Sequence, residues 1–385
     1  MSGRRSRTVL LVHYRLFADD WAAWLTNAGH HVEWLVPQTL TVEFVRAACQ
    51  ALAPRFIASI NFSPELALLA TLGQTPYVSW TVDPLGPQRF TLYDGTDPRL
   101  SVAFAHRRST VERLGKAGIA ASFLPLGAPA ERRRELALPS DAAEPRFDVS
   151  FVGSSLADEA RQLDQLVVDS GGDAALVADF RRFVDRELDA HEGDVTYAGM
   201  GDDGASLPAE LLARFGARPP PLALLADRVN GALSHALRAR RVHAVSKHTL
   251  GVFGDAGWSA SPSYRGAAKH GDELTRIYNA SALNLDVPRV YQRDIVTMRV
   301  FDVLSCAGVV LTEPSADLAE LFADGTELVT YRSDRELADA TDSLLRSPDL
   351  RKSIGQRGKL AVLERHQLSH RFQSIEEALV RRGLE

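Results

Sequence analysis

Hydrophobic residues along this chain follow two alternating patterns. Short continuous runs rich in Val, Ile and Leu are typical of buried parallel strands, and apolar residues three or four positions apart are typical of helices. In the first part of the chain, strands are expected at 8–13, 31–36, 56–61, 77–81, 102–105 and 121–126. Helices are expected between them, around Trp21 and at 42–52, 64–72 and 110–117. This alternation predicts a parallel sheet with helices on both faces.

A second strand-and-helix pattern begins at residue 148. Strands are expected at 148–153, 250–253, 266–269, 282–285, 309–312 and 328–331, and helices at 335–346, 350–364 and 369–382. Residues from about 156 to 245 show helical periodicity with few strand signals. The pattern therefore predicts a second doubly wound α/β domain that carries a mainly helical insertion.

The composition changes between these two patterns. Segment 131–146 combines an arginine run, prolines and an Asp/Glu/Ala-rich tail, which is typical of a linker. We predict an N-terminal Rossmann-like domain at 1–130, a linker at 131–146, a C-terminal Rossmann-like domain at 147–368 and a final helix in 369–385. Two doubly wound domains are expected to face a cleft at the carboxyl ends of their strands, where ligands bind in such folds.

Size, charge and cysteine usage narrow the function classes. A chain of 385 residues exceeds what one hydrophobic core usually supports, and a formal charge of −5 argues against bulk nucleic-acid binding. Cys49 and Cys306 stand in apolar contexts, so reduced thiols are expected, and no metal-ligand spacing is present. The apolar run at 9–12 is too short for a signal peptide, and no run of about 18 apolar residues exists. We expect a cytoplasmic protein without a transmembrane segment.

The stretch from 292 to 314 carries the most suggestive polar pattern. Asp294 and Asp302 are separated by seven residues, and Arg299 lies between them, where a helix is expected to begin near Thr297. Because a helix N-terminus attracts phosphate and a carboxylate can grip sugar hydroxyls, we expect Arg299 at a diphosphate, Asp302 at a ribose and Asp294 at a sugar. The alternative is that both carboxylates are solvated helix-end charges and that Arg299 pairs with Asp302.

Another candidate site begins at the end of the expected strand 148–153. Gly153 lets the backbone approach a ligand, Ser154 lies at the start of the following helix, and Arg161 lies about two turns further on. These three residues are candidates for phosphate binding. A single glycine is also what an ordinary tight strand-to-helix turn requires.

Four residues of the first domain stand at the ends of expected strands and could contact a second substrate, the acceptor of a transferred sugar. They are His13, Trp80, Asp83 and His106. Asp83 or His106 could act as general base on an acceptor hydroxyl, with His13 and Trp80 beside it, although each also fits an ordinary loop or strand-end position.

Residues 251–371 resemble the CgeB-like (spore maturation protein) glycosyltransferases. The resemblance rests on the following motifs: Tyr264-Arg-Gly266, Glu273-Leu274, Tyr278-Asn-Ala-Ser281, Leu283-Asn284, Met298-Arg-Val-Phe-Asp-Val-Leu-Ser-Cys-Ala-Gly308, Leu311-Thr312, Asp317-Leu-Ala-Glu-Leu-Phe322, Gly325 and Tyr331. It is looser at 151–161, 80–84 and 124–126. These proteins resemble the clan of GT-B enzymes that includes family 1 and family 4 type glycosyltransferases.

The resemblance implies a GT-B fold, α/β with two Rossmann-like domains, in which the second binds the nucleotide-sugar and the first the acceptor. It places Tyr278 and Asn279 in the donor site and implies no essential metal and no cofactor. The clan's Glu-x7-Glu pair would fall on Asp294 and Asp302, both one methylene shorter. The clan's Gly-Gly loop is absent, and the family's double Asp before Pro is reduced to Asp83 here. The final helix would cross back to the first domain.

These observations lead to one expected function and two alternatives. We expect a metal-independent glycosyltransferase that moves a sugar from a UDP, GDP or TDP sugar, with retention at the anomeric carbon, to an acceptor that could be a protein, glycan, lipid or modified nucleobase. The alternatives are a GT-B sugar-nucleotide epimerase and a non-catalytic carbohydrate-binding or scaffold protein on the same fold.

Overall fold

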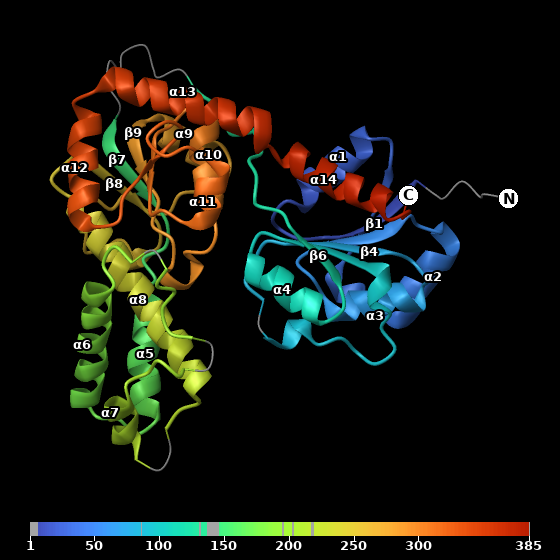
Figure 1. The fold of residues 1–385 in the computed structure, drawn as a ribbon, viewed down its shortest axis with the longest axis horizontal. Coiled ribbons are helices and arrows are strands. Elements are labelled where there is room, and N and C mark those ends of the chain that lie inside the picture. Colours follow the sequence, from blue (N-terminus) through green and yellow to red (C-terminus); the bar gives the residue numbers. More distant parts are fainter. Residues whose placement is uncertain are drawn as a thin grey trace. The chain divides into compact units, whose positions relative to one another are not determined.

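The computed structural model forms two compact units. It describes residues 7–85, 87–130, 132–136, 146–194, 196–201, 204–216 and 219–384. Unit 1 comprises Met1–Pro129 and Arg365–Glu385, and unit 2 comprises Ala130–Glu364. Each unit is an α/β fold built on one parallel sheet, which confirms the predicted fold class (Figure 1).

Unit 1 has a six-stranded sheet in the order β2-β1-β3-β4-β5-β6. Its strands are β1 (Thr8–Val12), β2 (His31–Leu35), β3 (Phe56–Ile60), β4 (Tyr77–Thr81), β5 (Ser101–Ala105) and β6 (Ala120–Phe123). Its helices are α1 (Ala18–Asn27), α2 (Val42–Leu52), α3 (Pro64–Leu72), α4 (Arg108–Lys116) and α14 (Leu368–Arg381). Thr41 and Ser63 cap α2 and α3 through their side-chain oxygens, and Pro64 occupies the first turn of α3, where its missing N–H costs nothing.

The C-terminal helix α14 packs on the sheet of unit 1 beside α1 (Figure 1). The rings of Trp21 and Phe372 are stacked with their centroids 5.8 Å apart, and Trp80 meets Phe372 edge-on at 6.1 Å. Arg371 is buried and donates from Nε to the carbonyl oxygens of Pro125 (2.9 Å) and Leu126 (3.0 Å). The last helix is therefore part of the core of unit 1.

Unit 2 has a five-stranded sheet in the order β11-β10-β9-β7-β8. Its strands are β7 (Phe147–Val152), β8 (Leu250–Phe253), β9 (Ser281–Leu285), β10 (Val310–Thr312) and β11 (Val329–Thr330). The helices of the insertion are α5 (Ala157–Asp169), α6 (Ala174–Ala190), α7 (Ala209–Leu212) and α8 (Leu222–Ala244). The remaining helices are α9 (Asp272–Asn279), α10 (Met298–Ser305), α11 (Ala316–Leu321), α12 (Asp334–Leu345) and α13 (Pro348–Arg365).

The prediction of a strand at 266–269 is wrong. The chain makes one isolated bridge, between Val252 and Tyr264, and then leaves β8. Gly266 has a φ of +96°, a left-handed conformation that takes the backbone out of an extended strand. The segment continues as irregular structure to α9.

The predicted linker is described only in part. Within 131–146, residue 131 and residues 137–145 lie outside the described residues. Residues 132–136 are fixed to unit 2: Glu135 pairs with Lys359 at 2.8 Å, and the amide of Leu136 donates to Asn279 Oδ1 at 2.7 Å. In the described part of the chain, no helix has both the length and the apolar character needed to cross a membrane.

Candidate active site

The carboxyl ends of three neighbouring strands bring polar residues to one edge of the unit 2 sheet. Gly153 and Ser154 follow β7, Asp286 follows β9, and Glu313 follows β10. The strand register sets Leu285 opposite both Phe151 and Leu311, so the residues after these strands leave the sheet at the same level. Carboxyl ends of parallel strands are where ligands bind in such sheets.

Asp286 joins this edge to the start of α10. Its carboxylate accepts hydrogen bonds from Thr297 Oγ1 and Thr312 Oγ1, both at 3.0 Å, and forms an ion pair with Arg299. Thr297 is the N-cap residue of α10, but its hydroxyl serves Asp286 instead of the helix. These contacts fix the guanidinium of Arg299 beside the end of β9.

Arg238 reaches the same edge from helix α8. It is 6% exposed and donates from Nη1 to the carbonyl oxygen of Ser154 at 2.8 Å and from Nε to that of Val287 at 3.3 Å. Among the residues that the structure describes, no carboxylate forms an ion pair with it. Burial, followed by the nearby charges of Arg299 and Arg289, lowers the pKa of Arg238 to about 9.

The charges around Arg238 do not balance. Arg299 pairs with Asp286, and Arg238 donates to the carbonyl oxygen of the next residue, Val287. Arg289 follows two residues later, and its charge and that of Arg299 both lower the pKa of Arg238. Arg289 donates to the Tyr291 hydroxyl at 2.5 Å. A surplus of about two positive charges on planar, multiply donating groups fits a diphosphate. We name these four charged residues the arginine cluster.

A second charged group nearby is balanced. Glu313 is buried and forms ion pairs with Arg241 at 3.2 Å and with Arg293 at 3.0 Å. Arg241 also pairs with Asp334. These carboxylates hold the pKa of Arg241 above its ordinary value despite burial. Because its charges are matched, this group ties α8 to β10 and α12 and leaves no surplus for a ligand.

The structure brings together three of the residues predicted to bind the donor. A Cβ placed on Gly153 would lie 3.2 Å from Arg299 Nη2 and 2.9 Å from the Phe151 ring, so a larger residue would displace its neighbours. Ser154 offers its carbonyl and its hydroxyl (3.2 Å) to Arg238. Gly153, Ser154 and Arg299 therefore belong to one site, although a ligand contact for each stays a prediction.

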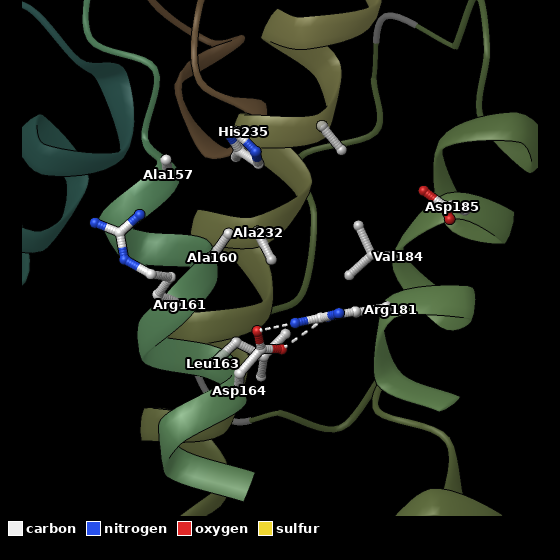
Figure 2. Close-up of a pocket in the computed structure, with 11 residues that line it drawn as sticks. Ala157, Ala160, Arg161, Leu163, Asp164, Arg181, Val184, Asp185, Ala232 and His235 are labelled. Carbon is white, nitrogen blue, oxygen red and sulfur yellow. Dashed lines mark hydrogen bonds and ion pairs between the residues drawn. The ribbon is translucent and has the colours of Figure 1, made fainter. Parts of the chain in front are cut away.

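Arg161 lies on a different surface. It is exposed on α5, pairs with Asp158, and lines a cavity of about 460 Å³ between α5, α6 and α8 (Figure 2). An ion pair between Arg181 and Asp164 links α6 to α5 there. His235, three residues before Arg238 on α8, also lines this cavity and contacts the carbonyl oxygen of Ser155 at 2.7 Å.

The predicted carboxylate pair divides into two environments. Asp302 is 2% exposed and pairs at 3.2 Å with Arg133, which is also buried. Burial raises the pKa of the Asp302 carboxyl, and the charge of Arg133 opposes this shift. Arg133 pairs with Oδ2 of this carboxylate, and the ribose contact of Asp302 stays a prediction. Asp294 lies exposed in the turn before α10.

Tyr278 and Asn279 lie at the end of α9. Tyr278 is 3% exposed, and burial together with the charge of Asp302 raises its pKa. Asn279 accepts from the amide of Leu136 and donates to the carbonyl oxygens of Arg134 (3.0 Å) and Thr275 (2.7 Å). In this arrangement the amide of Asn279 fixes segment 132–136, and its donor contact stays a prediction.

The four acceptor-side candidates in unit 1 lie in different environments, two of them buried and two at least partly exposed. Trp80 is fully buried and donates to the carbonyl oxygen of Leu124, and His106 is 5% exposed with Nδ1 at 3.0 Å from the carbonyl oxygen of Thr81. Their strands are covered on both faces, which argues against an acceptor contact for either side chain. His13 is exposed against Trp34. Asp83 is half-buried at the end of β4.

Sequence reasoning missed Arg238, Asp286 and Arg289. Arg238 stands in the stretch assigned to the insertion, where an arginine resembles any helix-surface cation. Asp286 directly follows the expected strand 282–285, and the rule that singled out Asp83 would have found it. Within the described ranges, no group of three or more His, Cys, Asp or Glu side chains has the geometry to hold a metal ion.

One stretch of the chain matches a known protein family by sequence. Residues 232–377 match the sequence profile of a family described as glycosyl transferase-like, a stretch that includes the whole arginine cluster. No curated protein matches the chain by sequence.

Solved structures share the fold over almost the whole chain. A glycosyltransferase from Rickettsia africae superposes with a TM-score of 0.56 at 10% identity, covering 98% of both chains. Sucrose-phosphate synthase from Thermosynechococcus elongatus gives 0.54 at 11% identity, covering 97% of this chain and 98% of its own. Anabaena HepE, crystallised with UDP and glucose, gives 0.52 at 10% identity, covering 97% and 99%.

These likenesses confirm the predicted GT-B fold, with two Rossmann-like units on parallel sheets. The match of residues 232–377 to the glycosyl transferase-like family confirms the predicted enzyme class, a glycosyltransferase.

Proposed function

We propose that this protein transfers a sugar from a nucleoside-diphosphate sugar to an acceptor as a member of the CgeB-like group. The profile match of residues 232–377 supports the transferase chemistry. The similar protein HepE, whose structures contain UDP and UDP-glucose, supports a nucleotide-sugar as donor. The motifs between 264 and 331 support the CgeB-like assignment.

The positive charge of the arginine cluster is the main structural support for a diphosphate-containing donor. Arg238, Arg289 and Arg299 offer a net surplus of positive charge at the carboxyl edge of the unit 2 sheet. Two backbone carbonyls and the Ser154 hydroxyl hold Arg238, and no carboxylate of the described residues pairs with it. Fixed guanidinium groups in a buried setting stabilise the charge that develops on a leaving diphosphate without having to reorganise. They can supply what a divalent cation supplies in other enzymes, so we propose a transferase that requires no metal and no cofactor.

The remaining roles follow from the same assignment. We assign the transferred sugar to the neighbourhood of Asp294, which is exposed in the turn that leads into α10, and the acceptor to unit 1 near Asp83. We propose retention at the anomeric carbon, as in the clan that the motifs resemble. The cytoplasmic location predicted from the sequence belongs to the same proposal.

A thermal-shift screen with UDP, GDP, TDP and their sugars, with EDTA present, tests the proposal. A ligand at about 100 times its dissociation constant adds about 2.7 kcal/mol of stability. The proposal predicts that one nucleotide series gives this shift in EDTA and that donor sugar is released or transferred. No shift with any of them would contradict it, and interconversion of sugars without acceptor would indicate an epimerase instead.

A further inference from the structure

Unit 1 contains a cavity at the carboxyl ends of its own strands. It has a volume of about 430 Å³ and lies over the ends of β1 and β3 and the start of α3. Apolar side chains form most of its wall, among them Leu40, Phe62, Leu66 and Leu69. A cavity of this size with a mostly apolar wall is typical of a site for a small organic molecule.

One side of the cavity carries a fixed polar group. Tyr14 and Asn61 both line the cavity, and both donate hydrogen bonds to Asp83 Oδ2, with Asn61 Nδ2 at 2.9 Å. Asn61 Oδ1 in turn accepts from the amides of Val82 (2.9 Å) and Asp83 (3.0 Å). Asn61 adopts a φ of +66°, which an asparagine tolerates better than most residues. The side chain of Asp83 is therefore held by two residues that line the cavity.

This group can accept a further hydrogen bond. The Tyr14 hydroxyl donates its proton to Asp83, so its oxygen keeps lone pairs for a donor in the cavity. No hydrogen bond within the described part of the chain engages Asp83 Oδ1. The other carboxylate of the cavity, Glu65, is already occupied by Ser63 (2.6 Å), Arg89 (3.2 Å) and Tyr93 (3.2 Å).

We propose that the acceptor is a small molecule with an apolar body and a hydroxyl group, bound in this cavity with the hydroxyl donating to the Tyr14–Asp83 pair. The inference rests on the proposed transferase function and names its acceptor class. A glycan carries hydroxyls around its ring, and most of them would be buried against Leu and Phe side chains without partners. The other polar side chains of the wall are already engaged, Ser59 with the carbonyl oxygen of Asn61, and Ser63 and Arg89 with Glu65. The Tyr14–Asp83 pair is therefore the polar group that matches a molecule with one hydroxyl on an aromatic or aliphatic skeleton.

Binding of methylumbelliferone, a planar phenol, tests the inference with its methyl ether and cellobiose as comparison ligands. Titration calorimetry on the full chain is expected to show binding of the phenol, weaker binding of the ether and no binding of cellobiose. Tyr14→Phe keeps the ring and removes the hydroxyl. It should weaken binding of the phenol about tenfold and leave the affinity for the ether unchanged, as expected for one lost hydrogen bond.

Filling the cavity gives the second readout. Leu66→Trp should abolish phenol binding, and Leu72→Trp is the matched control, because Leu72 lies on the same helix, is 39% exposed and does not line the cavity. If Leu66→Trp does not fold, Leu40→Trp at the half-buried end of the wall replaces it. Equal binding to the cavity-filled variant and the wild type would overturn the inference, as would binding of cellobiose in place of the phenol.

The outcome separates this inference from the proposed function. Nucleotide-induced stabilisation reports on unit 2 and needs no acceptor. A protein that binds a nucleoside diphosphate but no phenol would contradict the acceptor class alone, whereas one that binds phenol but no nucleotide would contradict the transferase.

Discussion

Arg238 Nη1 donates a 2.8 Å hydrogen bond to the carbonyl oxygen of Ser154. The contact joins helix α8 of the insertion to the loop that follows β7, and the guanidinium group is aligned by two backbone carbonyls and the Ser154 hydroxyl. A buried cation without a carboxylate is costly, and such groups are concentrated at functional sites. The insertion therefore supplies a central residue of the candidate donor site.

The lowered pKa of Arg238 predicts a pH effect on nucleotide binding. The group loses its proton as the pH rises through about 9, and a bound diphosphate favours the protonated form. Binding at pH 9 should therefore take up protons, and affinity should fall above that pH. Calorimetry at pH 9 in two buffers of different ionisation enthalpy measures the uptake. Identical observed enthalpies in the two buffers would contradict the prediction.

Gly153→Ala should weaken nucleotide binding without unfolding unit 2. The added Cβ would lie 2.9 Å from the Phe151 ring and 3.2 Å from Arg299 Nη2, so the ring must shift and the guanidinium must give way slightly. We expect about a tenfold loss of affinity, or about 1.4 kcal/mol. Gly115→Ala on α4 is the control: nothing lies within 4 Å of its added Cβ, and it should raise stability by about 0.5–1 kcal/mol with binding unchanged. Equal affinities of both variants would count against a ligand beside Arg299.

Much of the fold could be predicted from the sequence. All six strands of unit 1 were predicted. β1, β3, β4 and β5 are buried almost throughout and leave a strong local pattern of apolar residues. β2 and β6 are partly exposed and followed from the alternation of strands and helices. The prediction of a strand at 266–269 was wrong because this Gly-Ala-Ala-Lys segment has low strand propensity and Gly266 turns the backbone away.

The candidate site was harder to predict. Gly153, Ser154 and Arg299 could be found because they stand at strand or helix ends, where a general rule applies. Arg238 could not, because its role depends on how α8 crosses the sheet edge. Asp302 has the spacing of a ligand residue, yet its burial against Arg133 depends on segment 132–136, which is far away in sequence.

Removing one partner of the buried pair of Arg133 and Asp302 should strongly destabilise unit 2. Arg133→Met leaves a buried carboxylate and should cost about 3–5 kcal/mol, whereas the double variant with Asp302→Leu should recover most of this loss. Urea unfolding of the two single variants and the double variant measures the coupling.

The same pair gives a pH test. The pKa of Asp302 is raised above its unfolded value, so the folded state binds the proton more tightly and the cost of the charged form grows as the pH rises. The loss of unfolding free energy in Arg133→Met, relative to the wild type, should therefore become smaller as the pH falls from about 7 towards the ordinary pKa range of a carboxyl. A deficit that does not vary with pH would contradict this assignment.

Helix α14 should be needed for the stability of unit 1. Phe372 is 1% exposed and stacks on Trp21, so Phe372→Ala should cost about 3–5 kcal/mol. Unit 1 holds four of the five tryptophans, at positions 21, 24, 34 and 80, so tryptophan fluorescence during denaturation reports mainly on this unit. Gln373→Ala, at an exposed neighbouring position, should change stability by less than about 0.5 kcal/mol. An unchanged transition in Phe372→Ala would mean that the helix contributes little.

The central claim is that the arginine cluster binds a diphosphate without a metal. Titration calorimetry in EDTA, with the nucleoside diphosphate that stabilises the protein most, measures this for the wild type, Arg238→Met and Arg240→Met. Arg240 lies on the same helix but pairs with Asp189 at 2.6 Å, so its variant is the matched control. We predict that the wild type and Arg240→Met bind alike and that Arg238→Met binds at least about tenfold more weakly, as expected for a lost charged hydrogen bond of about 1.5–3 kcal/mol. Wild-type affinity in a folded Arg238→Met variant, or binding only when a divalent cation is present, would contradict the claim.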